Sequence, residues 1–180
     1  NLINFLSLKR SINYSDVAYS IGPMINSPGR LKNANLSVEL FCSTDENKIK
    51  KIISEIQLLN IKRKEIEKFC LKLINTNEYL IKDEVIFEVN SLFHEGIMGI
   101  IAGKLKDKFN KPAFVFTNSN DVYKGSARST YEFKLNPLLN KLLNSKIIDR
   151  GGGHNMAAGF VVNKKKINIF QKFVNSEYLK

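Results

Sequence analysis

The sequence predicts an α/β protein: a compact mixed-sheet domain preceded by a long connector helix and several short helices. Residues 45–76 contain no Gly or Pro and carry apolar side chains at helical spacing. From residue 84 onward, short apolar strands alternate with amphipathic helices, which is typical of a compact α/β module. We therefore expect two regions, 1–76 with the connector helix and 77–180 with the sheet.

The first 43 residues have the pattern of short helices. A helix is predicted to start near Tyr14 and to stop at Gly22-Pro23, because proline breaks a helix that reaches it. The stretch INSPGRL, residues 25–31, has the composition of a loop, and residues 33–43 are predicted as another short helix. Arg30 stands at the end of this loop, where a turn could aim its guanidinium at a ligand.

The long helix is predicted to begin with Thr44 or Asp45 as its N-cap. Its apolar residues make a heptad stripe with steps of three and four, if Arg63 fills the gap between the fourth and fifth: Ile49, Ile52, Ile56, Leu59, Ile66, Cys70 and Leu73. Such a helix is either a coiled-coil dimerisation element or a connector packed on its neighbours, and we favour the connector.

The second region alternates strands and helices. Its predicted elements are strands at 84–89, at 112–117 and within 121–130, and helices at 97–109, 135–144 and 167–179. Residues 147–162 predict a strand, a glycine turn, and a further strand or short helix.

Composition favours an anionic partner such as nucleic acid, because 28 Lys and Arg against 17 Asp and Glu give a net charge of +11. No run approaches the roughly 20 apolar residues of a membrane helix, and no cationic, apolar leader is present. We therefore expect a cytoplasmic protein without a membrane partner. Cys42 and Cys70 lie in apolar runs and are predicted to be buried free thiols.

The stretch GGGHNMAAGF, residues 151–160, concentrates four of the ten glycines and one of the two histidines. A glycine run allows close backbone approach and can direct N–H groups at an anion, and the adjacent His154 can donate to a phosphate. The alternative is a tight turn whose small residues serve close packing.

The stretch KGSARS, residues 124–129, is a second candidate. Ser126 and Arg128 would share one face of a strand, and a guanidinium suits phosphate oxygens. The alternative is an ordinary basic surface strand. His94 is more simply explained by a place near the start of the following helix. Because neither histidine has an acidic cluster beside it, these residues indicate a binding module and no metal site in this chain.

Together these segments resemble a known family. GGGHNMAAG is similar to the Gly-Gly-His-x-x-Ala-Ala-Gly signature of the DHH-associated domain, and KGSARS resembles the Lys-Gly-Ser-Gly-Arg-Ser segment of RecJ exonucleases. HEGIMGIIAGKLKDKFNKPAFVF and IGPMINSPGRLKNANLSVELF resemble further RecJ segments, in the same order. The chain departs from the family pattern at Ala127, which replaces a glycine, and at Pro28, which replaces a small residue.

The resemblance implies the carboxy-terminal, substrate-binding part of a RecJ-type exonuclease that degrades single-stranded DNA from its 5′ end in repair and recombination. Manganese or magnesium would be bound by an amino-terminal DHH domain whose Asp-His-His motif this sequence lacks. The chain alone is therefore expected to be inactive. The resemblance leaves open whether a helicase and a single-strand-binding protein are further partners.

The resemblance also assigns roles to residues. Ser126 and Arg128 would hold the terminal 5′ phosphate, and His154 would contact the substrate near the scissile phosphate. The full expected nucleic-acid-binding set is Arg30, Lys124, Gly125, Ser126, Arg128, Gly152, Gly153 and His154. Phe93 or Tyr123 could stack on bases.

Three other functions stay open on the sequence. One is a DHH-type phosphoesterase acting on short oligonucleotides or cyclic dinucleotides. Another is a non-catalytic nucleic-acid-binding module. The third is a structural dimer built on the helix at 45–76.

Overall fold

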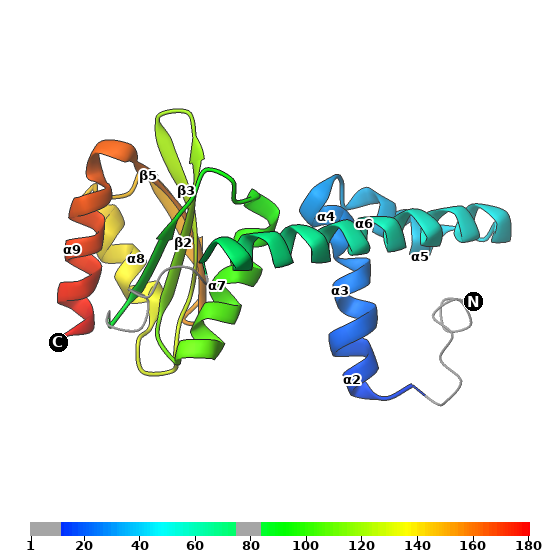
Figure 1. The fold of residues 1–180 in the computed structure, drawn as a ribbon, viewed down its shortest axis with the longest axis horizontal. Coiled ribbons are helices and arrows are strands. Elements are labelled where there is room, and N and C mark those ends of the chain that lie inside the picture. The colour runs from blue at the N-terminus through cyan, green and yellow to red at the C-terminus, as the bar shows by residue number, and fades with distance from the viewer. Residues whose placement is uncertain (1–11, 75–83) are drawn as a thin grey trace. The chain divides into compact units, whose positions relative to one another are not determined.

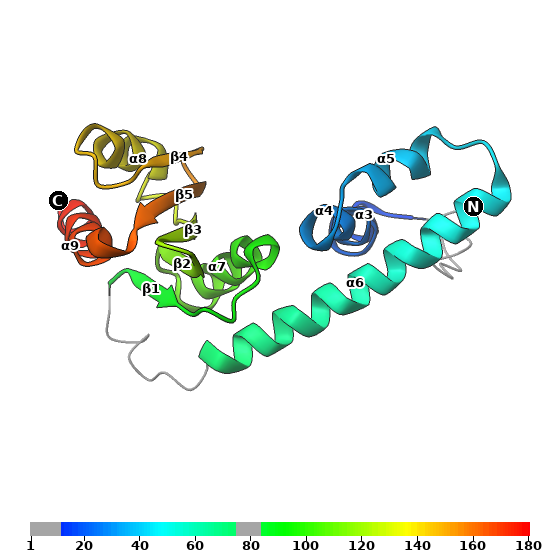
Figure 2. The same cartoon turned by 90° about the horizontal axis from the view of Figure 1, so that it is seen from above.

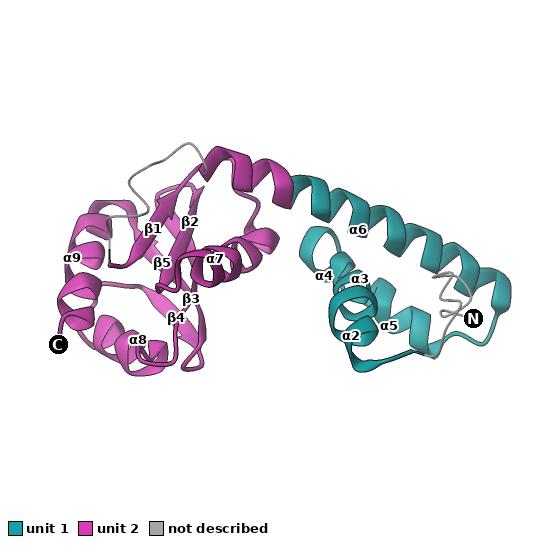
Figure 3. Cartoon of the chain, turned by 60° about the horizontal axis from the view of Figure 1, so that its bottom comes forward, with its two compact units in different colours: residues 1–66 teal, residues 67–180 magenta. Residues whose placement is uncertain are grey.

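The computed structural model describes residues 12–74 and 84–180. The chain divides into two compact units, residues 1–66 and residues 67–180 (Figure 3). The predicted boundary between residues 76 and 77, and the predicted last two residues of the long helix, lie outside the described residues. No described helix is both long enough and apolar enough to cross a membrane.

The first unit is helical. Its elements are α2 (Tyr14–Asp16), the π-helical segment η1 (Val17–Ile21), α3 (Gly22–Ile25), α4 (Ser27–Leu31), α5 (Asn35–Cys42) and the start of α6 (Glu46–Ile74). Asn13 begins α2 with a capping box, because its side chain accepts from the Asp16 N–H while the Asp16 carboxylate accepts from the Asn13 N–H. The short helix predicted at 33–43 is confirmed by α5.

The predicted helix stop at Gly22-Pro23 is wrong, because helical structure continues through Pro23 to Ile25. Proline lacks an N–H and crowds the carbonyl four residues earlier. A π segment before Pro23 accommodates this, with the Gly22 N–H donating to the Val17 carbonyl. A Cβ atom on Gly22 would lie 2.9 Å from that same oxygen, so glycine fits the wider turn.

The loop predicted at 25–31 is also wrong, because Ser27–Leu31 form the short helix α4. Pro28 lies in its first turn, where a missing N–H costs nothing. The buried Ser27 hydroxyl lies 2.7 Å from the Met24 carbonyl oxygen and 3.3 Å from that of Ile56, which fixes α4 against α6. Arg30 is therefore held on a helix, half-buried.

The long helix α6 begins as predicted, since the Asp45 carboxylate accepts from the N–H groups of Asn47 and Lys48. Within the first unit, Ile52 and Ile56 of its stripe are buried, whereas Leu59 and Ile66 are half-buried, and the role of the helix as a connector stays a prediction. The first-unit core consists of Met24, Leu40, Ile52, Ile53 and Ile56.

The two cysteines differ. Cys70 is buried, as predicted, and its burial raises the pKa of its thiol. The prediction for Cys42 is wrong, because this thiol is exposed at the last residue of α5. One face of α5 packs on the core, through the buried Leu40 and the partly buried Leu36, so an apolar run alone did not decide which of its residues are buried.

The second unit carries a five-stranded mixed sheet in the order β1-β2-β3-β5-β4 (Figure 1). Its strands are β1 (Ile86–Val89), β2 (Ala113–Ser119), β3 (Val122–Arg128), β4 (Arg150–Gly153) and β5 (Ala157–Asn163). Its helices are the end of α6, α7 (Glu95–Phe109), α8 (Leu135–Asn144) and α9 (Ile167–Tyr178), with the 3-10 turn η3 (Lys164–Lys166) before α9. Only β1 and β2 are parallel, and α7 is the crossover between them. The predicted α/β class with a mixed sheet is confirmed.

Helices cover both faces of this sheet (Figure 2). The helix α7 lies on one face, while α8 and α9 lie on the other. Between the sheet and α8 and α9 is an aromatic core whose rings include Phe114, Phe116, Phe160 and Phe170. Because strand residues alternate between faces, one set of β3 and β5 side chains enters this core and the other set faces the side of α7.

The glycine turn predicted within residues 147–162 is wrong. Arg150–Gly153 form the extended edge strand β4, which pairs antiparallel with β5, and the turn follows at residues 154–156. Pairing with β5 supplies β4 with backbone hydrogen bonds, so three consecutive glycines adopt a conformation that glycine alone does not favour.

Candidate nucleic-acid interface

The strand β3 divides its predicted site residues between the two faces of the sheet. Lys124, Ser126 and Arg128 face the side of α7, whereas Gly125 and Ala127 face the aromatic core. A Cβ atom on Gly125 would lie 2.2 Å from the Phe160 ring, so packing alone explains this glycine. The predicted shared face of Ser126 and Arg128 is confirmed.

Helix α7 comes close to this face of β3 at Gly99. A Cβ atom on Gly99 would lie 3.0 Å from Arg128 Nη2 and 3.2 Å from Ser126 Oγ. A larger residue would therefore push against both polar groups. Gly99 was missed in the sequence because a glycine in an amphipathic helix carries no sign of its tertiary neighbours. The only available signal was its cost to the helix, about 1 kcal/mol relative to alanine.

Arg128 is a half-buried cation on β3. Its Nη1 donates to the Ala127 carbonyl at 2.9 Å, and no Asp or Glu among residues 12–74 and 84–180 forms an ion pair with it. Desolvation by burial lowers the pKa of its guanidinium. Ser126 Oγ lies 3.4 Å from the Ala158 carbonyl. A desolvated guanidinium with spare donors next to a hydroxyl can bind an oxyanion.

The next two strands, β5 and β4, continue this face of the sheet with glycines, which have no side chain. Ser126 pairs with Gly159, and Gly159 pairs with Gly152, so these three residues form a row across β3, β5 and β4. We call it the glycine row. A Cβ atom on Gly152 would meet nothing within 4 Å, and one on Gly159 would meet only the Gly125 carbonyl oxygen at 4.0 Å. Packing therefore does not explain these two glycines.

The other glycines of the run do have packing reasons. A Cβ atom on Gly153 would lie 2.2 Å from the Ala157 carbonyl oxygen, and one on Gly151 would lie 3.0 Å from Ile148 Cδ1. The two alternatives considered for the run thus apply to different members. Close packing explains Gly151 and Gly153, whereas Gly152 leaves open space above the backbone.

His154 begins the exposed turn that joins β4 to β5. Its N–H donates to the Ala157 carbonyl at 2.8 Å, and Ala157 pairs with Arg128 across β5 and β3. The Met156 carbonyl accepts from the Ser129 N–H at 3.1 Å, which ties the turn to the end of β3. His154 and Arg128 therefore lie on neighbouring segments at the same end of these strands.

The remaining predicted residues have defined places. Lys124 Nζ forms an ion pair with Glu95 Oε1 at 2.6 Å, at the first residue of α7. Arg30 belongs to the other compact unit, and its contribution to the same nucleic-acid path stays a prediction. His94 is the N-cap of α7, since its Nδ1 accepts from the Gly96 N–H, as its predicted structural place implied.

The two rings considered for base stacking have other partners. Phe93 is only 4% exposed, which removes it from contact with a base. Tyr123 is half-buried, with its ring 6.3 Å from that of Phe116 and Lys164 Nζ 5.7 Å from its centroid.

A metal ion does not fit the described residues. Residues 12–74 and 84–180 contain no group of three or more His, Cys, Asp and Glu side chains that could hold one. The interface can thus bind and orient an anionic chain, and it offers no ligand set for a catalytic metal.

Comparison with known proteins gives one family and several relatives. Residues 82–180 match the DHHA1 domain family. The single-stranded-DNA-specific exonuclease RecJ of Haemophilus influenzae is 30% identical over 172 residues, which cover 89% of this chain and 30% of that protein. RecJ of Salmonella typhimurium is 31% identical over 169 residues, which cover 88% of this chain and 29% of that protein. The chain thus spans about a third of the length of these curated relatives.

Solved structures share the fold. RecJ of Thermus thermophilus in complex with Mg²⁺ superposes with a TM-score of 0.86 at 23% identity, covering 99% of this chain and 27% of that one. A structure of exonuclease RecJ bound to manganese superposes with a TM-score of 0.81 at 24% identity, covering 99% and 44%. At these identities the likeness establishes the fold.

Proposed function

Because the chain belongs to the DHHA1 domain family, we propose that it is the substrate-binding part of a RecJ-type exonuclease acting on single-stranded DNA from the 5′ end. The names of the curated relatives support this substrate and reaction. Residues 77–180 would bind the DNA, and residues 1–76 would connect them to the rest of the enzyme. The role would lie in DNA repair and recombination.

The half-buried Arg128 beside Ser126, which forms no ion pair with a described carboxylate, is the observation that carries this proposal. Its fork of donors and the Ser126 hydroxyl would hold the terminal 5′ phosphate, replacing the water that burial removes from the guanidinium. Lys124 would add charge at the same face. Because a phosphate carries more charge at a 5′ end than within the chain, this site would favour a phosphorylated terminus.

The edge strand would receive the phosphodiester that is cut. Gly152 lets the DNA backbone approach the sheet closely, and His154 would donate a hydrogen bond to a phosphate oxygen there. Gly153 keeps the turn tight against β5, which fixes the position of His154. These residues would bind and orient the substrate.

Manganese or magnesium would be held by ligands outside the described residues and would activate the attacking water in the complete enzyme. The metals named for the RecJ structures support this choice of ions. A helicase and a single-strand-binding protein are partners that such an enzyme would use on duplex or coated DNA.

The first test is binding of 5′-phosphorylated and 5′-hydroxyl oligo-dT of equal length, measured by fluorescence anisotropy. We expect tighter binding of the phosphorylated strand. Arg128→Ala should lower the ratio of the two affinities by about tenfold or more, because hydrogen bonds between charged groups are stronger than those between neutral groups. Arg128→Lys should keep part of it, since lysine retains the charge and loses the fork.

Lys165→Ala is the matched control, because Lys165 is an exposed cation in the η3 turn. It should leave the preference for the 5′ phosphate unchanged. Equal discrimination by the wild-type chain and Arg128→Ala would refute the assignment of the 5′-phosphate site.

A second test addresses catalysis. With manganese, this chain should bind labelled single-stranded DNA without cutting it, and a version extended upstream should cut it from the 5′ end. Cleavage by these 180 residues alone would overturn the proposed division of labour.

A further inference from the structure

We propose that Lys124 and Arg150 form a second phosphate site for the same DNA strand, one nucleotide beyond the phosphodiester placed at Gly152 and His154. This inference rests on the proposed function. It starts from an open hollow of about 500 Å³ on the second unit, lined by Lys124, Gly125, Arg150, Gly151, Gly159, Phe160 and Val161.

The register of the strands places the two cations on either side of this hollow. Lys124 pairs with Val161, and Val161 pairs with Arg150, so the three form a second row across β3, β5 and β4. Two strand spacings separate the outer members, which puts their backbones about 10 Å apart. We call this the cationic row. It lies on the same face as the glycine row, two residues farther along each strand.

The spacing between the two rows suits an extended nucleic acid. Residues i and i+2 of a strand lie about 7 Å apart, close to the span of one nucleotide in a stretched single strand. A backbone that has the phosphodiester to be cut at Gly152 could therefore place its next phosphate between Lys124 and Arg150, two residues along β4. The glycine row offers no side chain to block this path, since Gly152 and Gly159 have open space above them.

The charges of the cationic row are available to a ligand. Arg150 is exposed, and among residues 12–74 and 84–180 none forms an ion pair with it. Lys124 pairs with Glu95, but their side chains are 36% and 52% exposed, and such a pair contributes little stability. A phosphate would thus displace a weak contact at one end and meet a free guanidinium at the other.

The experiment compares 5′-phosphorylated mono- and trinucleotides of thymidine, titrated into the full chain and followed by NMR. Arg150→Ala should leave mononucleotide affinity unchanged and weaken trinucleotide binding about two- to fivefold, the range expected for an exposed charge. With a longer oligo-dT, the slope of log affinity against log salt should fall by about 0.7, the contribution of one single-strand phosphate contact. Lys165→Ala should change neither the trinucleotide affinity nor the salt slope.

A second variant tests the path itself without changing a charge. Gly159→Val places a β-branched side chain in a strand, where it is well tolerated, and its Cβ has only one neighbour within 4 Å. Gly159→Val should weaken trinucleotide binding, while the midpoint of its urea unfolding stays close to that of the wild type. Unchanged trinucleotide binding in both Arg150→Ala and Gly159→Val would overturn the second site.

Failure of the second phosphate site can be distinguished from failure of the proposed function. Loss of 5′-phosphate preference in Arg128→Ala, with wild-type trinucleotide binding by both Arg150→Ala and Gly159→Val, would refute only the second site. Equal loss of mono- and trinucleotide binding in Arg150→Ala would also refute it, because Arg150 would then contact the first phosphate.

Discussion

The glycines at this interface are present for different reasons, which are shown by the atoms that a Cβ at each position would contact. Gly125 and Gly153 are required by atoms that would otherwise collide with a Cβ, whereas Gly152 and Gly159 are not. A glycine in a strand costs stability and gains no packing. Its presence at open positions supports the proposed approach of DNA to the backbone there.

Gly99 is the residue whose change should separate site geometry from stability. In Gly99→Ala the new methyl group would lie 3.0 Å from Arg128 Nη2, so the guanidinium has to move. We expect the preference for a 5′-phosphorylated strand to fall severalfold. Fluorescence anisotropy on the two strands measures it.

Gly103→Ala is the matched control on the same helix. A Cβ at position 103 would have only Arg128 Cγ nearby, at 4.0 Å, so phosphate preference should persist. Helix stability should rise by about 1 kcal/mol, the usual gain from glycine to alanine. A wild-type preference in Gly99→Ala would show that Arg128 does not need its present position to recognise the phosphate.

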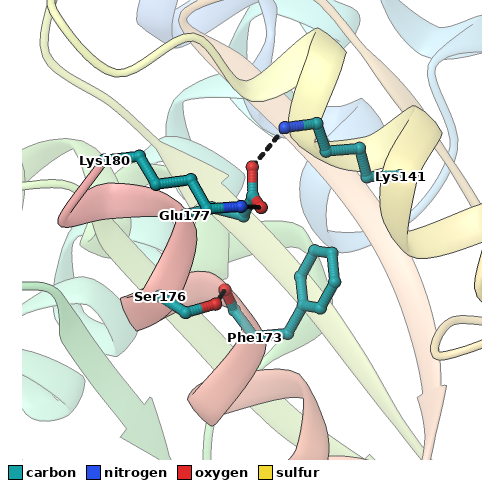
Figure 4. Close-up of polar contacts among 5 residues, drawn as sticks. All are labelled: Lys141, Phe173, Ser176, Glu177 and Lys180. Atoms are coloured by element: carbon teal, nitrogen blue, oxygen red, sulfur yellow. Dashed lines mark hydrogen bonds and ion pairs between the residues drawn. The ribbon is translucent and has the colours of Figure 1, made fainter.

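At the scale of elements, α8 and α9 are joined at the far face of the sheet by one carboxylate. Glu177 near the end of α9 pairs with Lys141 of α8 and with Lys180 (Figure 4). Hydrogen bonds from Lys141 and then Lys180 lower the pKa of Glu177. The ionised form is thus favoured in the folded chain.

This pairing predicts a pH-dependent effect of Glu177→Gln. A lowered folded-state pKa means that the contribution to stability is present above the unfolded value of about 4.5 and is lost as the pH falls through the folded value. Glu177→Gln should therefore lower the urea midpoint slightly at pH 7, and the difference from wild type should vanish well below pH 4.5. An equal difference at both pH values would show that the change acts through packing.

The strand β4 shows how pairing overrides composition. Its four residues, RGGG, have low strand propensity, and a turn was the reasonable expectation. Antiparallel pairing with β5 decides the outcome, because the seven-residue strand β5 has backbone groups on the side away from β3 that pair with β4. The turn is displaced to the residues after the glycines, and His154 moves with it.

At the scale of the whole molecule, the two units are stabilised by separate sets of buried residues. Ile56, fully buried, belongs to the first-unit core, and Val162, also fully buried, belongs to the aromatic core of the second unit. Among the described residues, none belongs to both of these sets. Packing defects in one unit should therefore act mainly on that unit.

Ile56→Ala tests this separation. Loss of a fully buried isoleucine costs about 2–5 kcal/mol, and it should raise amide hydrogen exchange within residues 12–66 while residues 84–180 keep their protection. Val162→Ala is the reciprocal control and should affect the second unit. Amide hydrogen exchange is measured by mass spectrometry. An equal rise in exchange in both units, in either variant, would contradict the separation.

The sequence by itself was sufficient for the α/β class, most of the helices and strands, an N-cap at Thr44 or Asp45, the shared face of Ser126 and Arg128, and the resemblance to RecJ. These features depend on local periodicity and on short motifs, which a chain displays before it folds. The same local signals failed at Gly22-Pro23, at Ser27–Leu31 and at the glycine run, where a π turn, a buried hydroxyl and strand pairing decided the conformation.

Only the tertiary structure decided which polar groups share a surface. Gly99 lies against Arg128 although 29 positions separate them, and Arg150 faces Lys124 across a strand that follows both in the sequence. Strand register and helix placement result from the packing of the aromatic core, and no local pattern encodes them. For that reason the motifs could be predicted, while the open glycine row and the cationic row beside it became visible only in the folded chain.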